Sequence, residues 1–230
     1  MVDILAVGAH PDDVEIGAGG IIAAVVRNGK SAAILDLTNG EPTPKGTPET
    51  RAKEAEKARS LLNAQTRITL DLKNRELMDT VEARVKVAEV YRQLKPEVLL
   101  LPYWEDAHPD HIQASHLSQA ARFVAKYTKT SMKGEPYYPT KVFYYFCTHL
   151  KKDLQAPLVF DISETFDIKM EAIKAYRSQF HDVDPERADK VLRKLEATAI
   201  YYGSLINVRY GEPILNAENI GISSFDAFIK

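Results

Sequence analysis

The sequence has little of what marks secreted or membrane-spanning proteins. Its only cysteine, Cys147, cannot form an internal disulfide and lies in an apolar run, where we interpret it as a small buried hydrophobic residue. No apolar stretch approaches the roughly 18 residues of a membrane span, and the first one, "ILAVG", is too short for a signal segment. We therefore expect a cytoplasmic protein that does not insert into a membrane.

The sequence also lacks an excess of either sign of charge. It has 30 Lys and Arg against 32 Asp and Glu, a formal net charge of −2, and these residues are mixed along the chain. Proteins that bind the phosphate backbone of nucleic acids carry a basic patch or stripe. The composition therefore argues against nucleic acid as a partner, and we expect a small-molecule ligand.

What the sequence does have is an alternation of strand-like and helix-like segments. With 230 residues, 45% of them hydrophobic, we expect a single domain over residues 1–230. The alternation is typical of an α/β fold, Rossmann-like, with a mostly parallel sheet and helices on both faces. Strands are predicted at 2–8, 31–41, 66–72, 97–103, 141–146 and 157–162, and helices at 14–29, 49–64, 80–95, about 109–126, about 164–178 and 185–203. Residues 211–230 show no periodic pattern.

Two short polar clusters each follow the end of a predicted strand. "HPDD" at 10–13 follows the first strand, and "HPDH" at 108–111 follows the fourth. In a doubly wound sheet with right-handed crossovers, the fourth strand commonly returns to lie beside the first. The two clusters would then meet at the topological switch point, where open α/β sheets bind ligands.

Two histidines and a carboxylate at one crevice match the ligands of a catalytic zinc site. Such a site uses three protein ligands and keeps a position open for water. The metal lowers the pKa of the water, and a nearby carboxylate can accept its proton. Because Asp12 and Asp13 are adjacent in non-helical backbone, their side chains point apart, so one can bind the metal while the other acts as a base. The sequence therefore suggests a metal-dependent hydrolase.

A second interpretation stays open at this point. Asp and Pro at the start of a helix are ordinary capping residues, so both clusters could be helix caps of a non-catalytic, nucleotide-binding Rossmann-like module. The glycines at 17, 19 and 20 give this interpretation little support, because they fall inside the first predicted helix and the preceding turn carries acid instead of bare N–H groups. A metal analysis would separate the two hypotheses.

The motifs resemble those of one known family. "AHPDDVEIGAGG", "TNGE", "GTPETRAKEA" and "HPDH" occur in the order and at the spacing of the PIG-L/LmbE-like zinc-dependent N-acetylglucosamine deacetylases. "DLTNGE" and "DISETFDIKMEAIKAYRSQF" are most similar to the branch that deacetylates N-acetylglucosaminyl malate in bacillithiol synthesis. The resemblance implies an LmbE-like fold and that activity. The alternatives are a diacetylchitobiose-type deacetylase and an amidase relative acting on mycothiol conjugates.

The resemblance also implies a cofactor, an assembly and roles for individual residues. It implies Zn²⁺ as cofactor and a homo-oligomer, with a hexamer as a candidate assembly. The implied roles are zinc ligation by His10, Asp13 and His111, general-base catalysis by Asp12, assistance at the oxyanion or leaving amine by His108, and orientation of His108 by Asp110.

Two cationic residues are candidates for binding the substrate. Arg51 lies at the start of a predicted helix, where the helix dipole disfavours a cation unless an anionic partner is present. Lys141 stands before the aromatic strand where relatives often have an arginine, and a lysine keeps the charge but loses the planar fork. We interpret His149 as a surface or core histidine outside the site. The neighbouring acids Glu105 and Asp106 are interpreted as surface residues of a loop.

Overall fold

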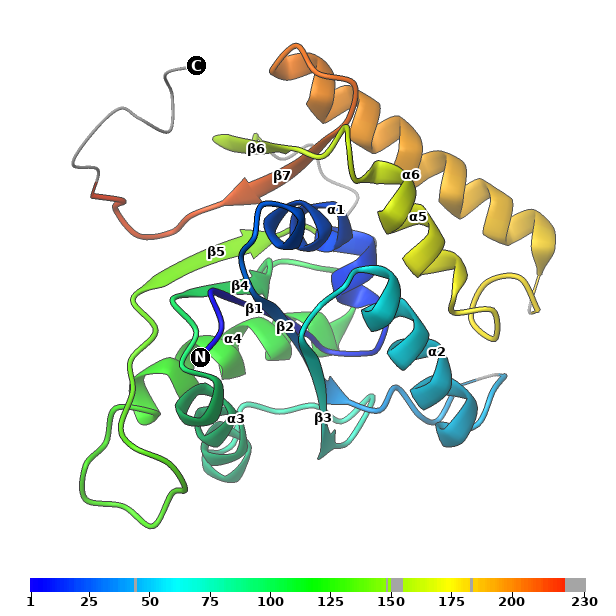
Figure 1. The fold of residues 1–230 in the computed structure, drawn as a ribbon. Helices are drawn as coiled ribbons and strands as arrows, with labels where there is room; N and C mark the ends of the chain where they lie inside the picture. Colours follow the sequence, from blue (N-terminus) through cyan, green and yellow to red (C-terminus); the bar gives the residue numbers. More distant parts are fainter. Residues whose placement is uncertain (44, 148, 150–154, 183, 222–230) are drawn as a thin grey trace.

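The fold is a single mixed sheet with helices packed on both of its faces (Figure 1). The computed structural model describes residues 1–43, 45–147, 149, 155–182 and 184–221. Within these residues the sheet has seven strands in the order β3-β2-β1-β4-β5-β7-β6. The strands are β1 (Ile4–Gly8), β2 (Ala32–Thr38), β3 (Thr66–Leu72), β4 (Val98–Pro102), β5 (Lys141–Tyr145), β6 (Leu158–Asp161) and β7 (Gly211–Leu215).

The strand order confirms the expectation that the fourth strand returns to the first. Ile4 at the start of β1 pairs in parallel with Ala32 of β2 on one side and with Val98 of β4 on the other. β3 and β5 continue the parallel part of the sheet outward. The carboxyl ends of β1 and β4 therefore lie side by side at one edge, and the loops that follow them start from neighbouring positions.

The helices begin and end close to the predicted positions. They are α1 (Asp13–Arg27), α2 (Pro48–Leu61), α3 (Val81–Leu94), α4 (Pro109–Val124), α5 (Phe166–Lys174) and α6 (Pro185–Leu205). Capping residues explain several of these starts: Thr47, Thr80 and Asp184 each accept a hydrogen bond from a backbone N–H in the first turn of the helix that they precede. In the described part of the chain, no helix is both long and apolar enough to cross a membrane.

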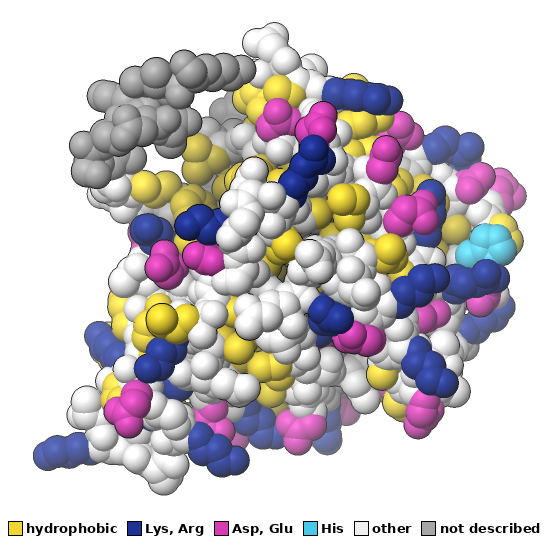
Figure 2. All heavy atoms as spheres, viewed as in Figure 1, with side chains coloured by type: hydrophobic (Ala, Val, Ile, Leu, Met, Phe, Trp, Pro, Cys, Tyr) yellow, Lys and Arg dark blue, Asp and Glu magenta, His cyan; other side chains and the backbone are white. Residues whose placement is uncertain are grey.

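The two faces of the sheet are buried in separate cores, because successive strand residues point in opposite directions. In β1, Leu5 and Val7 belong to the core under α3 and α4, whereas Ala6 belongs to the core under α1, α2, α5 and α6. Figure 1 shows these two helical layers on opposite sides of the strands. On the face shown in Figure 2, Lys and Arg are interspersed with Asp and Glu, as the composition led us to expect.

Helix α1 packs closely against its neighbours through its small residues. A Cβ added to Gly17 would overlap the ring of Tyr145 in β5, and one added to Gly20 would lie 2.7 Å from the side chain of Ile162. The hydroxyl of Tyr145 also donates to the carbonyl oxygen of Val7 at 2.8 Å. The aromatic strand therefore lies directly beneath the helix that begins at the first polar cluster.

Strand β7 lies in the segment for which the sequence showed no pattern, and this expectation is corrected. Residues 211–215 pair antiparallel with both β5 and β6, although Pro213 has no N–H to contribute to the ladder. Five residues with a proline and a glutamate are too few to show a period of two. Residues 222–230 of that segment lie outside the described residues.

The glutamate of β7 serves helix α1. Glu212 is buried and accepts hydrogen bonds from the backbone N–H groups of Gly20 (3.1 Å) and Ile21 (2.7 Å), while the amino group of Lys169 in α5 donates to it at 2.5 Å. A buried carboxylate requires such partners, because leaving it unpaired would cost several kcal/mol. Three elements distant in the sequence are thus fixed to one another.

Candidate metal and catalytic site

The two polar clusters meet at the carboxyl edge of the sheet, as the strand order requires. The first fills the turn from β1 into α1, and the second fills the turn from β4 into α4. The rings of His10 and His108 lie 4.9 Å apart between centroids, and those of His10 and His111 lie 5.4 Å apart. Residues separated by a hundred positions in the sequence therefore share one site.

The three expected ligands converge on one point. Asp13 lies between the two imidazoles, with its Oδ2 3.5 Å from Nδ1 of His10 and its Oδ1 3.2 Å from Nε2 of His111. One potential ligand atom from each residue lies within 4.8 Å of the others, and all three side chains are nearly buried. Two nitrogens and one carboxylate oxygen form a donor set suited to zinc. The ligation itself stays a prediction.

The neighbouring carboxylates favour the protonated form of both imidazoles. Burial lowers the pKa of His10, but hydrogen bonds to Asp110 and Asp13 outweigh it and raise that pKa to about 9. Burial likewise opposes the charged form of His111, and the carboxylate of Asp13 raises its pKa well above the usual range. Metal ligation needs neutral imidazoles, so a metal ion and protons would compete for these nitrogens.

Two further groups of potential ligands adjoin the first. The ligand atoms of His10, His108 and Asp110 also lie within 4.8 Å of one another, as do those of Asp106, His111 and Cys147. Each group shares a histidine with the expected set. The described residues at this edge of the sheet thus hold one continuous cluster of nitrogen, oxygen and sulfur donors.

Asp12 adopts a strained backbone conformation at the start of α1. Its φ of 115° is in the left-handed region, which a residue with a Cβ rarely adopts, and its side chain makes no capping hydrogen bond to the helix. Burial raises the pKa of Asp12 to about 7, against the effect of the neighbouring Arg51 cation. The side chain is 18% exposed. Asp12 is therefore a spare, partly accessible carboxylate beside the expected ligands.

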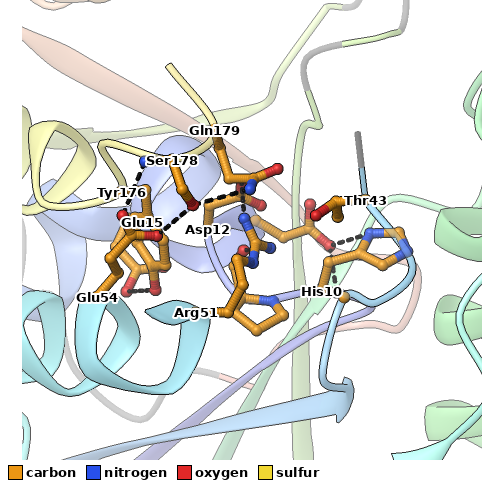
Figure 3. Close-up of polar contacts among 12 residues, drawn as sticks. His10, Asp12, Glu15, Thr43, Arg51, Glu54, Tyr176, Ser178 and Gln179 are labelled. Atoms are coloured by element: carbon orange, nitrogen blue, oxygen red, sulfur yellow. Dashed lines mark hydrogen bonds and ion pairs between the residues drawn. The ribbon is translucent and has the colours of Figure 1, made fainter. Parts of the chain in front are cut away.

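Arg51 lies beside Asp12, as Figure 3 shows. Its side chain is 3% exposed; its Nη2 donates to the carbonyl oxygen of Pro11 at 2.7 Å, and its Nη1 is 3.8 Å from Oδ2 of Asp12. The ring of Tyr176 lies beneath its guanidinium, 5.7 Å from Cζ. Within the described residues, Nε and Nη1 of Arg51 are buried without a hydrogen-bond partner. Asp12 therefore supplies part of the negative charge that we expected beside this cation. Substrate binding by Arg51 stays a prediction.

The relation between His108 and Asp110 differs from the expected one. His108 caps α4, and its Nδ1 accepts a hydrogen bond from the backbone N–H of Asp110 at 3.2 Å. The carboxylate of Asp110 points elsewhere: its Oδ2 is 3.2 Å from Nε2 of His10 and accepts the backbone N–H of Arg75 at 2.6 Å. Asp110 thus orients His108 through its main chain, because a residue two positions after the helix cap presents its N–H to that cap.

Lys141 is not part of the site, which corrects the expectation for this residue. It is exposed and begins β5, where it pairs with Val98 at the start of the parallel strand β4. The site lies at the carboxyl ends of these strands, about four residues further along, or roughly 13 Å at the usual rise per strand residue. Lys141 therefore lies at the opposite edge of the sheet.

Three residues of the site were not expected from the sequence. The ring of His149 lies 5.6 Å from that of His111, Cys147 adjoins His111, and the side chain of Asp106, interpreted as a surface acid, is 1% exposed. A signal for two of them was present, because Cys147 and His149 follow the carboxyl end of β5, which is the neighbour of β4. No local pattern distinguishes Asp106 from Glu105.

A buried ionic network lies beneath the first turn of α1. Arg67 of β3 donates from Nε and Nη2 to the two oxygens of Asp36 in β2 at 2.6 and 2.7 Å, and from Nη1 to Glu15 at 2.5 Å. The hydroxyl of Tyr176 donates to the same oxygen of Glu15 at 2.9 Å. Figure 3 shows Glu15 and Tyr176 on the far side of Asp12 from His10. The network ties the start of α1 to two strands and to the segment after α5.

The segment after α5 also contacts α2, the helix that carries Arg51, and the loop before that helix. Ser178 donates from its N–H and its hydroxyl to the two oxygens of Glu54 in α2, at 2.8 and 2.7 Å. Gln179 donates to the carbonyl oxygen of Lys45 at 3.0 Å. Figure 3 shows these side chains above Arg51 and Asp12. The position of Arg51 therefore depends on contacts more than a hundred residues away.

Comparisons with known proteins agree with this geometry. Residues 5–122 match the model of the PIG-L family, described as GlcNAc-PI de-N-acetylase. Diacetylchitobiose deacetylase of Thermococcus kodakarensis is 29% identical over an alignment that covers 92% of this chain and 81% of the relative. Among solved structures, the conserved protein TT1542 from Thermus thermophilus is 36% identical with a TM-score of 0.89, covering 98% of this chain and 99% of that one. The N,N'-diacetylchitobiose deacetylase from Pyrococcus horikoshii is 26% identical with a TM-score of 0.79, covering 98% and 88%.

Proposed function

The chain is a deacetylase of the PIG-L family, and from that premise we propose that it hydrolyses the acetamide of an N-acetylglucosamine unit in a small sugar, using a zinc ion held by His10, Asp13 and His111. The observation that carries the proposal is the convergence of these three ligands with a spare carboxylate, Asp12, beside them. The interpretation of the two clusters as ordinary helix caps does not account for this convergence.

For the sugar, we place a diacetylchitobiose-type substrate first. Two relatives with this named substrate align with more than nine-tenths of the chain, whereas the expectation of N-acetylglucosaminyl malate rested on motif similarity alone. The malate conjugate is the second candidate, and Arg51 is the observation that favours it. Two of its nitrogens have no hydrogen-bond partner among the described residues and could form charge-assisted hydrogen bonds to a substrate carboxylate.

The donor set fits a catalytic zinc ion. Two imidazole nitrogens and one carboxylate oxygen would provide three protein ligands, the number that catalytic zinc sites use. When bound, zinc makes a water molecule a nucleophile near neutral pH and polarises the carbonyl of the acetamide. The surrounding residues then have to accept and deliver protons.

We assign the transfer of the water proton to Asp12. Its carboxylate is accessible to a small ligand, is not in the proposed ligand set, and has a pKa raised by burial to about 7, which suits a general base at neutral pH. Its side chain accepts no capping hydrogen bond from the N–H groups of α1, so the carboxylate is not committed to the helix. The nearby Arg51 favours the ionised form.

We assign stabilisation of the acetamide oxygen, through a hydrogen bond from Nε2, to His108. Because its Nδ1 accepts the N–H of Asp110, a neutral His108 carries its proton on Nε2. Burial and the neighbouring His111 lower the pKa of His108, which favours the neutral ring with Nε2 as a donor. Its backbone N–H is held by Asp106 at 2.8 Å.

The test combines metal removal with a substrate comparison. Chelator-treated protein is expected to lose acetate release from diacetylchitobiose and to regain it with about one zinc ion per chain. His111→Ala is expected to lose tight zinc binding while its circular dichroism is unchanged, and His116→Ala, an exposed histidine on the same helix, serves as the matched control. Zinc stoichiometry in His111→Ala equal to that of the wild type would refute the ligand set. A higher kcat/KM for the malate conjugate than for diacetylchitobiose would reverse the order of the two substrates.

A further inference from the structure

We infer that Asp106 is a positioning residue that holds His111 with its Nε2 lone pair facing the proposed metal, an inference that rests on the proposed function. Asp106 lies in the loop between β4 and α4, and its side chain is 1% exposed. Its Oδ2 is 3.4 Å from Nδ1 of His111, and its Oδ1 accepts the backbone N–H of His108 at 2.8 Å. One buried carboxylate therefore faces both histidines of the second cluster.

The direction of the His111 ring explains why this contact matters. Nε2 of His111 faces Asp13, so this nitrogen is the one available to a cation held with Asp13 and His10. Binding through Nε2 leaves the ring proton on Nδ1, which must then find an acceptor in a buried environment. Within the described part of the chain, Nδ1 of His111 makes no hydrogen bond of good geometry, and the Asp106 carboxylate is the charged group beside it.

Cys147 also lies near His111. A ligand atom from each of Asp106, His111 and Cys147 lies within 4.8 Å of the others, so the thiol is a second candidate acceptor for the Nδ1 proton. Sulfur is a weak acceptor, whereas an ionised carboxylate forms a charge-assisted hydrogen bond about twice as strong as a neutral one. We therefore expect the carboxylate of Asp106, and not the thiol, to accept the Nδ1 proton and fix the tautomer.

The spacing of the loop residues has a physical reason on this basis. In "DAHPDH", the carboxylate of Asp106 accepts the N–H of the helix cap His108, two residues further along the chain. It also faces the ring of His111, five residues further along and in the first turn of α4. A single side chain thus sets the position of the proposed ligand relative to the proposed hydrogen-bond donor. Glu105, one position earlier, is exposed and makes a matched comparison in the same loop.

The experiment compares Asp106→Asn with Glu105→Gln and Cys147→Ala. Zinc affinity is measured by chelator competition, and unfolding is followed in parallel. Partners of metal-bound histidines typically contribute 10–100-fold in metal affinity, so we expect Asp106→Asn to bind zinc about 10–100-fold more weakly at a similar unfolding midpoint. Glu105→Gln is expected to bind zinc as the wild type does, and Cys147→Ala, which removes a weak acceptor, is expected to lose less zinc affinity than Asp106→Asn. Wild-type affinity in Asp106→Asn, or a loss in Cys147→Ala alone, would overturn the inference.

Two measurements keep the test decisive. If Asp106→Asn does not fold, ¹H–¹⁵N NMR of the zinc-loaded wild-type protein is expected to show a slowly exchanging proton on Nδ1 of His111, and a ring without that proton would contradict the role of Asp106. Zinc binding and acetate release by the wild type separate the two levels of the proposal. A wild-type protein that neither binds zinc nor releases acetate would refute the proposed function itself. If the wild type is active and Asp106→Asn binds zinc as tightly as the wild type does, only the positioning role is refuted.

Discussion

Replacing Arg67 by Met tests whether the buried network beneath the first turn of α1 stabilises the fold. The guanidinium is 4% exposed and pairs with two carboxylates, Glu15 and Asp36, that are fully buried. Methionine preserves most of the length of the side chain and removes the charge. The variant thus leaves two carboxylates facing each other in an apolar core without the cation between them.

The expected loss follows from the cost of leaving buried charges unpaired. Breaking a buried ion pair by removing one partner costs about 3–5 kcal/mol, and here one substitution breaks two pairs, so we expect the upper part of that range near neutral pH. Burial already raises the pKa of Asp36, and Arg67 opposes this effect, so the pKa rises further in the variant. When the pKa of a carboxyl group is higher in the folded than in the unfolded state, the fold loses stability as the pH rises from the unfolded-state pKa, near 3.8, to the folded-state pKa. The destabilisation is therefore expected to be larger at pH 8 than at pH 5.

The assay is denaturant unfolding of wild type and variant across this pH range. Arg27→Met is the control, because Arg27 pairs with Glu164 on the surface, where both side chains are more than half exposed and ion pairs contribute little. A loss in Arg67→Met below about 1 kcal/mol, well under the range for a broken buried pair, or one that does not change between pH 5 and pH 8, would refute the argument from unpaired buried charge.

Two further substitutions test the catalytic assignment and the packing of α1. Asp12→Asn is expected to retain zinc while kcat falls about 10²–10⁴-fold, the usual contribution of a positioned base, and a kcat near that of the wild type would exclude Asp12 from proton transfer. Gly17→Ala places a methyl group against the ring of Tyr145, so we expect an overpacking cost of about 1–3 kcal/mol or more in denaturant unfolding. A methyl group at Gly19 meets the side chain of Lys169 at 3.2 Å, a milder contact than the one at Gly17, so Gly19→Ala should cost less; equal losses would contradict the packing argument.

The fold could be predicted because its signals are local. Buried parallel strands read as short apolar runs, and their alternation with helices limits the topology to a few choices. Strand β7 was missed because a strand of five residues that contains Pro213 is defined by its two partners and shows no period of its own. The oligomeric state and the extent of the domain stay predictions.

The site could be predicted only as far as strand ends determine it. Residues directly after β1 and β4 had to meet once those strands were neighbours, which brought His10 and His111 together. The direction of a side chain within a loop depends on contacts outside it. Asp110 turns to His10 and the N–H of Arg75, and Asp106 turns inward to His111, although both lie beside residues whose positions were predicted.

The support of α1 by Tyr145 and Glu212 has a consequence for protein engineering. Every residue assigned a role in catalysis or metal binding lies before position 122, so that this stretch looks like a natural module to transplant or to minimise. Yet its supports come from strands beyond residue 140. Tyr145 donates to the carbonyl of Val7 and packs against Gly17, and Glu212 accepts the N–H groups of Gly20 and Ile21. A graft that ends at position 122 would carry the complete catalytic set on a helix without the groups that anchor it. A minimal catalyst therefore has to include β5 and β7, however few reactive residues they contain.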